Sequence, residues 1–104
     1  MPRFIMTYIG GDRPSSEEEG QKQFARYQQW LGSLGDAAVS PMNPIRGTRT
    51  LSAGGAESEG SSVGMSGYTI VEADDLEAAL AMARNCPFLE INGTLEVSEL
   101  VQMS

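Results

Sequence analysis

The sequence predicts an α+β fold, built as one domain over residues 1–104. Three observations predict it: an apolar strand pattern near the N-terminus, an amphipathic helix pattern after it, and a strand–helix–strand pattern in residues 67–101. Local propensity, capping residues and apolar periodicity agree within each of these segments. Such agreement between levels is typical of a sequence that specifies one structure.

The first strand is expected at residues 4–9. Its two faces are both largely apolar, with Phe4, Met6 and Tyr8 on one and Ile5, Thr7 and Ile9 on the other. This pattern is typical of a central strand that is covered on both sides. A Gly-Gly-Asp-Arg-Pro segment then breaks the strand.

A helix is expected next. A capping box precedes it, formed by Ser15 with Glu18 or by Ser16 with Glu19. Gly35 is a natural C-terminal stop. Apolar side chains recur at helical spacing between these ends, at Phe24, Tyr27, Leu31 and Leu34.

The middle of the chain carries weaker signals. Residues 37–40 are a short strand candidate, and Pro41 and Pro44 keep this region at a sheet edge or in a turn. Residues 46–51 are a candidate for further extended structure. Residues 52–64 are rich in Gly, Ser and Glu, so we expect a flexible surface loop there.

The last third reads as strand, helix, strand. Residues 68–73 favour a strand, Asp74 and Asp75 can cap a helix, and Asn-Cys-Pro at 85–87 ends it. The apolar stripe of this helix is Leu76, Ala79, Leu80 and Ala83, and the returning extended segment carries Leu95, Val97 and Val101. The order of elements is therefore the ferredoxin-like βαββαβ arrangement, with the first and third strands central and both helices on one face.

One layer of helices covers one face of such a sheet. The two central strands nevertheless place apolar side chains on both faces. We therefore expect a second copy of the chain to cover the other face, giving a symmetric homodimer packed sheet to sheet.

Composition excludes several classes of function. The formal net charge of -7 disfavours binding to nucleic acid or to anionic membranes, because both depend on Lys and Arg. The chain contains no histidine, which rules out Ser–His–Asp and Cys–His catalysis and the usual zinc sites. The Gly-Gly pairs lack a phosphate-loop pattern, so we expect no cofactor and no metal.

The compartment is expected to be the cytoplasm. Cys86 is the single cysteine, which excludes an intrachain disulfide and suits a reducing environment. No window resembles a signal peptide or a membrane span of roughly 20 apolar residues.

Three parts of the sequence resemble the YCII-related (DGPF-type) proteins: residues 4–8, residues 30–44 with Trp30, Gly35 and Met-Asn-Pro, and residues 67–97. The resemblance implies a dimeric α+β barrel with a cleft between the sheet and neighbouring loops. Some members of this family are suspected enzymes with a His–Asp pair. This chain has neither a histidine nor the Asp-Gly-Pro-Phe segment, so that pair is not carried over.

Candidate site residues are few. Asp36 is a weak candidate for an acid or base, with Tyr27 beside it, although a solvated turn aspartate explains it better. The residues proposed to bind a ligand are Tyr8, Trp30, Asn43, Arg46, Arg49 and Tyr68. The arginines can form a donor fork for a carboxylate or phosphate, and the aromatics can anchor a ligand, but surface and core roles are the simpler alternatives.

Our first interpretation of the sequence is a dimeric small-molecule-binding or accessory module. Two alternatives stay open. The chain could be a cofactor-independent enzyme of the dimeric α+β barrel type that acts on a small organic substrate. It could instead be a structural partner of another protein, with residues 52–64 becoming ordered on binding.

Overall fold

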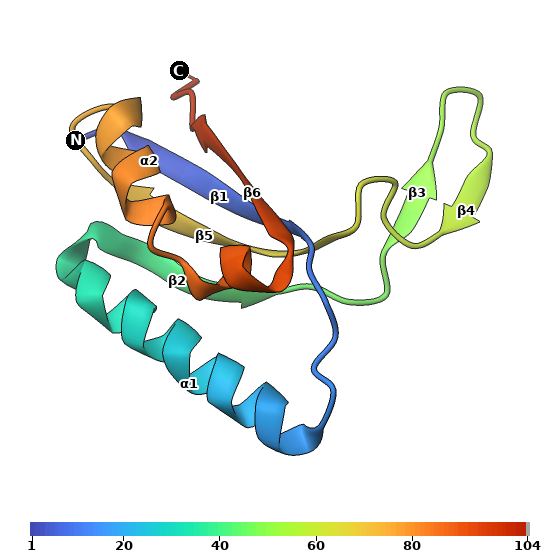
Figure 1. Cartoon of the computed structure of the whole chain (residues 1–104). Helices are drawn as coiled ribbons and strands as arrows, with labels where there is room; N and C mark the ends of the chain where they lie inside the picture. Colours follow the sequence, from blue (N-terminus) through green and yellow to red (C-terminus); the bar gives the residue numbers. More distant parts are fainter. Residues whose placement is uncertain (104) are drawn as a thin grey trace.

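The computed structural model of the chain describes residues 1–103. A four-stranded antiparallel sheet has the order β2-β5-β1-β6. These strands are β1 (Arg3–Gly10), β2 (Ala38–Pro44), β5 (Met65–Glu72) and β6 (Gly93–Glu99). The helices α1 (Glu17–Leu34) and α2 (Leu76–Ala83) lie on one side of the sheet (Figure 1). The α+β, ferredoxin-like prediction is confirmed, with β1 and β5 in the centre.

Local capping fixes where both helices begin. The Ser16 side chain accepts a hydrogen bond from the Glu19 amide, so the second of the two expected capping boxes provides the cap of α1. Asp75 caps α2 by accepting from the Ala78 amide at 2.8 Å. Gly35 ends α1 with a positive φ of 56°, which glycine adopts without strain.

The core lies between the sheet and the helices. Phe4, Met6 and Val71 from the two central strands are fully buried, and Ala79 of α2 packs against the same cluster. The Trp30 indole, only 5% exposed, donates from Nε1 to the Met82 carbonyl at 3.0 Å and so joins α1 to α2. Trp30 therefore has the core role that was its simpler alternative.

Strand β2 is longer than expected. It continues through Pro41 to Pro44, whereas the sequence suggested an end near residue 40. Proline is tolerated because β2 is an edge strand, and its register with β5 shifts between Ser40 and Asn43. The expected edge position is confirmed, and the expected end of the strand near residue 40 is wrong.

Residues 45–64 leave the sheet and return to it. Within them, β3 (Arg49–Leu51) and β4 (Glu57–Glu59) form a two-stranded hairpin that extends away from the body (Figure 1). Part of the expected loop at residues 52–64 therefore has strand structure. Its flexibility stays a prediction. Two short 3-10 helices, η1 (Gly35–Ala37) and η2 (Pro87–Ile91), complete the fold.

Among residues 1–103, no helix combines the length and the apolar character that crossing a membrane requires.

Candidate ligand-binding pocket

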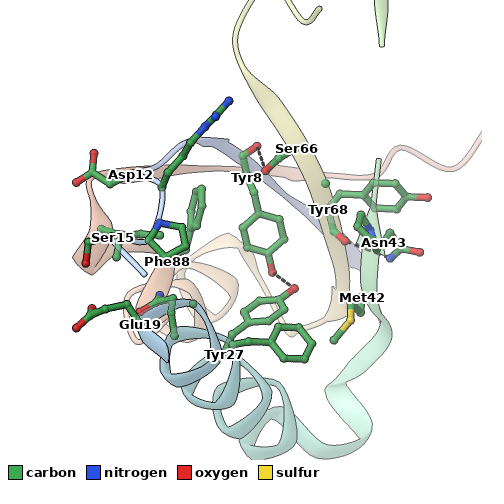
Figure 2. Close-up of a pocket in the computed structure, with 18 residues that line it drawn as sticks. Tyr8, Asp12, Ser15, Glu19, Tyr27, Met42, Asn43, Ser66, Tyr68 and Phe88 are labelled. Carbon is green, nitrogen blue, oxygen red and sulfur yellow. Dashed lines mark hydrogen bonds between the residues drawn. The ribbon is translucent and has the colours of Figure 1, made fainter. Parts of the chain in front are cut away.

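A cavity of about 530 Å³ lies on the helix side of the sheet. Strand β1, the start of α1, the end of β2 and η2 surround it (Figure 2). Its apolar wall consists mainly of aromatic rings, namely Tyr8, Phe24, Tyr27 and Phe88. Pockets of this size and lining are typical sites for small organic ligands.

The aromatic rings are held edge to face. The ring of Tyr8 is 5.7 Å from that of Tyr27 and 5.3 Å from that of Phe88, with near-perpendicular planes in both pairs. This geometry is a favourable arrangement of aromatic quadrupoles. Phe24, which the helical spacing placed in the core stripe, is 48% exposed and instead forms part of the pocket wall.

The position of the Phe88 ring is fixed by close packing against two glycine residues. A Cβ atom on Gly93 would lie 2.4 Å from two atoms of the Phe88 ring, and one on Gly11 would lie 2.7 Å from it. Neither site has room for a larger side chain. The backbone of Asp12 donates to the Ile91 carbonyl at 2.6 Å, and the Asn92 side chain donates to Asp12 Oδ2 at 2.6 Å. These contacts tie the β1–α1 connection to the end of η2.

A chain of hydroxyl groups lies at the inner end of the pocket. The Tyr27 hydroxyl donates to the Tyr8 hydroxyl at 3.0 Å, as Figure 2 shows. Tyr8 Oη is 2.5 Å from Thr69 Oγ1, and Thr69 Oγ1 donates to the Pro41 carbonyl at 2.6 Å. Each hydroxyl group of this chain therefore has a hydrogen-bond partner within the protein, and Tyr27 forms the end of the chain that borders the pocket.

Burial keeps Tyr8 neutral. Desolvation raises the pKa of the Tyr8 phenol far above its ordinary value, and the hydrogen bond with Thr69 opposes this only in part. Tyr8 can therefore donate and accept hydrogen bonds but cannot serve as a phenolate base near neutral pH.

Charged side chains border the pocket at the start of α1 and in the connection before it. They are Asp12, Arg13 and Glu19, two acidic groups and one basic group. We did not predict these residues, nor Phe88, as part of a site. The Gly-Gly-Asp-Arg-Pro segment directly after a central strand was the signal available for the first two.

The sequence-based site residues divide into two groups. Tyr8, Asn43 and Tyr68 border the pocket, with the Asn43 amide donating to the Tyr68 carbonyl at 3.2 Å. The Tyr68 ring points away from Tyr8 and Tyr27 (Figure 2). Trp30 lies in the core instead of the pocket wall.

The remaining candidates lie elsewhere. Arg49 is in the β3–β4 hairpin, where its guanidinium pairs with Glu57 at 2.6 Å, and Arg46 is exposed between β2 and that hairpin. Asp36 is exposed in η1 and does not border the pocket. Tyr27, its suggested companion, does border the pocket, so the structure does not bring the two together.

Cys86 is buried, with 2% of its surface exposed. Desolvation raises the pKa of its thiol from 9.0 to about 11, which keeps it protonated at neutral pH. Its interpretation as a small buried apolar residue agrees with this position. Within residues 1–103, no group of three or more His, Cys, Asp or Glu side chains is arranged to hold a metal ion.

Comparison with known proteins adds a family and a fold. A search of curated sequences finds no match. Among solved structures, the chain is similar to the 5-chloro-2-hydroxyhydroquinone dehydrochlorinase of Burkholderia phenoliruptrix, in complex with 2,5-dihydroxybenzoquinone. The TM-score is 0.53 at 19% identity, covering 97% of this chain and 95% of that one. A family model described as the YCII-related domain matches residues 4–104, and the chain therefore belongs to the YCII-related family.

Proposed function

We propose that this protein binds a small, largely apolar organic molecule, with an aromatic ring as its preferred core, in the pocket between β1, α1, β2 and η2. The observation that carries the proposal is the cavity of about 530 Å³ walled by four aromatic rings, with a hydroxyl chain at its inner end. Aromatic walls bury the ligand, and a few fixed polar groups orient it. The small-molecule complex of the structurally similar dehydrochlorinase supports a ligand for this fold.

The test is a thermal-shift titration with small aromatic alcohols, acids and amines. A ligand that binds the native state at about ten times its Kd raises Tm by roughly 5 °C for a domain of this size. In Phe24→Glu a charge replaces an apolar part of the pocket wall, so the shift is lost. Leu76→Glu is the matched control, since Leu76 is 44% exposed, similar to Phe24, and lies outside the pocket. An equal shift in both variants contradicts the proposal.

A second candidate function is catalysis without a cofactor on a small organic substrate. The supporting observation is that two acidic residues, Asp12 and Glu19, line the same pocket as Tyr27. Asp12 replaces Asp36 as the candidate base, because Asp36 does not reach the pocket. Turnover by the native protein that disappears in Asp12→Asn, with ligand affinity retained, supports the enzyme. Ligand binding without turnover supports the binding module.

We also propose that two copies form a homodimer through the open face of the sheet. Both helices lie on the opposite face (Figure 1). Ile5 and Ile70 pair across the two central strands on the open face and are only partly buried in the single chain. An apolar face that its own chain leaves open is typical of an interface between subunits.

The cytoplasm remains our proposed compartment. Support comes from the single cysteine, which leaves no intrachain disulfide and suits a reducing environment. Assignment to the DGPF-type subgroup also remains a proposal, supported by residues 67–79 and opposed by the missing Asp-Gly-Pro-Phe segment.

A further inference from the structure

The hydrogen bonds of the hydroxyl chain in the pocket all run in one direction, from donor to acceptor. Thr69 Oγ1 lies 2.6 Å from the Pro41 carbonyl oxygen, which can only accept a hydrogen bond. Two oxygens at that distance need a hydrogen between them, so the single hydroxyl hydrogen of Thr69 is directed to Pro41. Thr69 must then accept from Tyr8.

The same reasoning extends to the end of the chain. Tyr8 Oη is 2.5 Å from Thr69 Oγ1 and uses its single hydrogen there. Tyr8 therefore accepts from Tyr27, whose hydroxyl lies 3.0 Å away. The backbone carbonyl of Pro41 sets the order Tyr27, Tyr8, Thr69, Pro41, and the phenolic hydrogen of Tyr27 is already committed to the protein.

We propose, building on the binding function above, that the pocket selects ligands carrying a hydrogen-bond donor, a neutral phenol or a related hydroxyl or N–H group. Tyr27 borders the pocket and has lone pairs on its oxygen but no hydrogen to offer. A ligand hydroxyl or N–H can donate to it. A ligand that carries only acceptors, such as an ether or a ketone, places its oxygen against another lone pair.

The charges around the pocket favour a neutral or cationic donor over an anion. Asp12 and Glu19 contribute two carboxyl groups against the one guanidinium of Arg13, in a chain of net charge -7. Carboxylate ligands are thus disfavoured both by charge and by the acceptor character of Tyr27.

The experiment compares 2-naphthol with 2-methoxynaphthalene by isothermal titration calorimetry at pH 7. The two probes share an aromatic body and differ in whether the oxygen carries a hydrogen. We expect 2-naphthol to bind about five-fold more tightly, the effect of one neutral hydrogen bond. Equal affinity, or tighter binding of the ether, overturns the donor selectivity and leaves the binding function intact. Absence of binding by both probes overturns both proposals.

Two variants separate hydrogen bonding from the size of the methyl group. Tyr27→Phe removes the acceptor, so the two probes bind with about equal affinity, whereas steric rejection of the ether would persist in this variant. Thr69→Val removes the group that directs the chain and lets Tyr8 donate to Tyr27, which lowers or reverses the preference. Persistence of the five-fold preference in Tyr27→Phe overturns the proposal, even if Thr69→Val does not fold.

Thr50→Val is the matched control for Thr69→Val. Thr50 Oγ1 donates to the Gly60 carbonyl at 2.7 Å, so this substitution also removes a threonine hydroxyl that donates to the backbone. Thr50 lies in the β3–β4 hairpin, outside the pocket. Thr50→Val therefore keeps the wild-type preference for 2-naphthol, and loss of that preference overturns the proposal.

Discussion

The Tyr8 hydroxyl lies 2.5 Å from Thr69 Oγ1 in the buried layer between the sheet and α1. The two residues are on neighbouring central strands, 61 positions apart in the sequence. Tyr8 lies on the same, helix-facing side of β1 as the buried residues Phe4 and Met6. Its ring therefore packs like a core residue, while its hydroxyl needs a polar partner. Thr69 supplies that partner, and the pair forms the polar end of an otherwise apolar cavity.

Tyr8→Phe is expected to lower the free energy of unfolding by about 1 kcal/mol, since it removes a hydrogen-bonded hydroxyl from a buried position. Urea denaturation followed by circular dichroism measures the change. Tyr68→Phe is the control on the adjacent strand, because the Tyr68 hydroxyl has no hydrogen bond within residues 1–103 and its removal changes stability by less than about 0.5 kcal/mol. Equal effects of the two substitutions would show that the Tyr8 hydroxyl chain does not stabilise the fold.

Gly93→Ala is expected to destabilise the protein by about 1–3 kcal/mol, because the new Cβ forces Phe88 to move within a packed site. That Cβ would lie 2.4 Å from the ring and 2.6 Å from the Phe88 carbonyl oxygen. Gly32→Ala is the control within α1, where an added Cβ meets nothing within 4 Å. Gly32→Ala gains up to about 1 kcal/mol from helix propensity. Thermal melts of wild type and both variants measure the changes: Gly93→Ala should lower Tm, and Gly32→Ala should not.

The Cys86 thiol is expected to make the free energy of unfolding depend on pH in the alkaline range. Because its pKa rises from 9.0 to about 11 on folding, the folded state holds the proton more tightly than the unfolded state. The thiol therefore favours folding below pH 9, and that contribution decreases as the pH rises toward 11. Between pH 7.5 and 9.5 the wild type should lose about 1 kcal/mol more stability than Cys86→Ala. Parallel urea melts at the two pH values measure the difference, and identical pH slopes contradict it.

Ile70→Glu is expected to convert a homodimer into a monomer, because it places a charge in the centre of the open sheet face. Light scattering should give twice the 11.1 kDa mass of one chain for the wild type and a single mass for the variant. Leu51→Glu, at a hairpin position that is 71% exposed, should remain dimeric. A wild-type protein that is monomeric at dilute and high concentrations contradicts the proposed interface.

The fold could be predicted largely because its signals are local. Ser16 and Glu19, and Asp75 and Ala78, are three positions apart, and the alternation in β1 is visible within eight residues. The continuation of β2 through Pro41 was missed because an edge position, which only the complete sheet defines, removes the usual penalty for proline.

The site could be predicted only in part, because distant segments build it. Phe88 reaches the pocket through its contact with Gly93 and Gly11, and Asp12 is held by Asn92, which is 80 positions away. Periodicity within one segment carries no information about such contacts. The sequence suggested Trp30 as a ligand-binding residue, but its side chain packs in the core, where the Met82 carbonyl of α2 accepts its hydrogen bond.

The most direct test of the proposed binding site is a map by two-dimensional ¹H–¹⁵N NMR during titration with 2-naphthol. Binding in the pocket should give chemical-shift changes centred on pocket residues, with the Gly20 and Gly67 amides among them. The Gly54 and Gly55 amides, in the distant hairpin turn, should stay unchanged. Shifts that cluster on the hairpin or on the open sheet face, with Gly20 and Gly67 unaffected, would contradict the assignment of this pocket as the binding site.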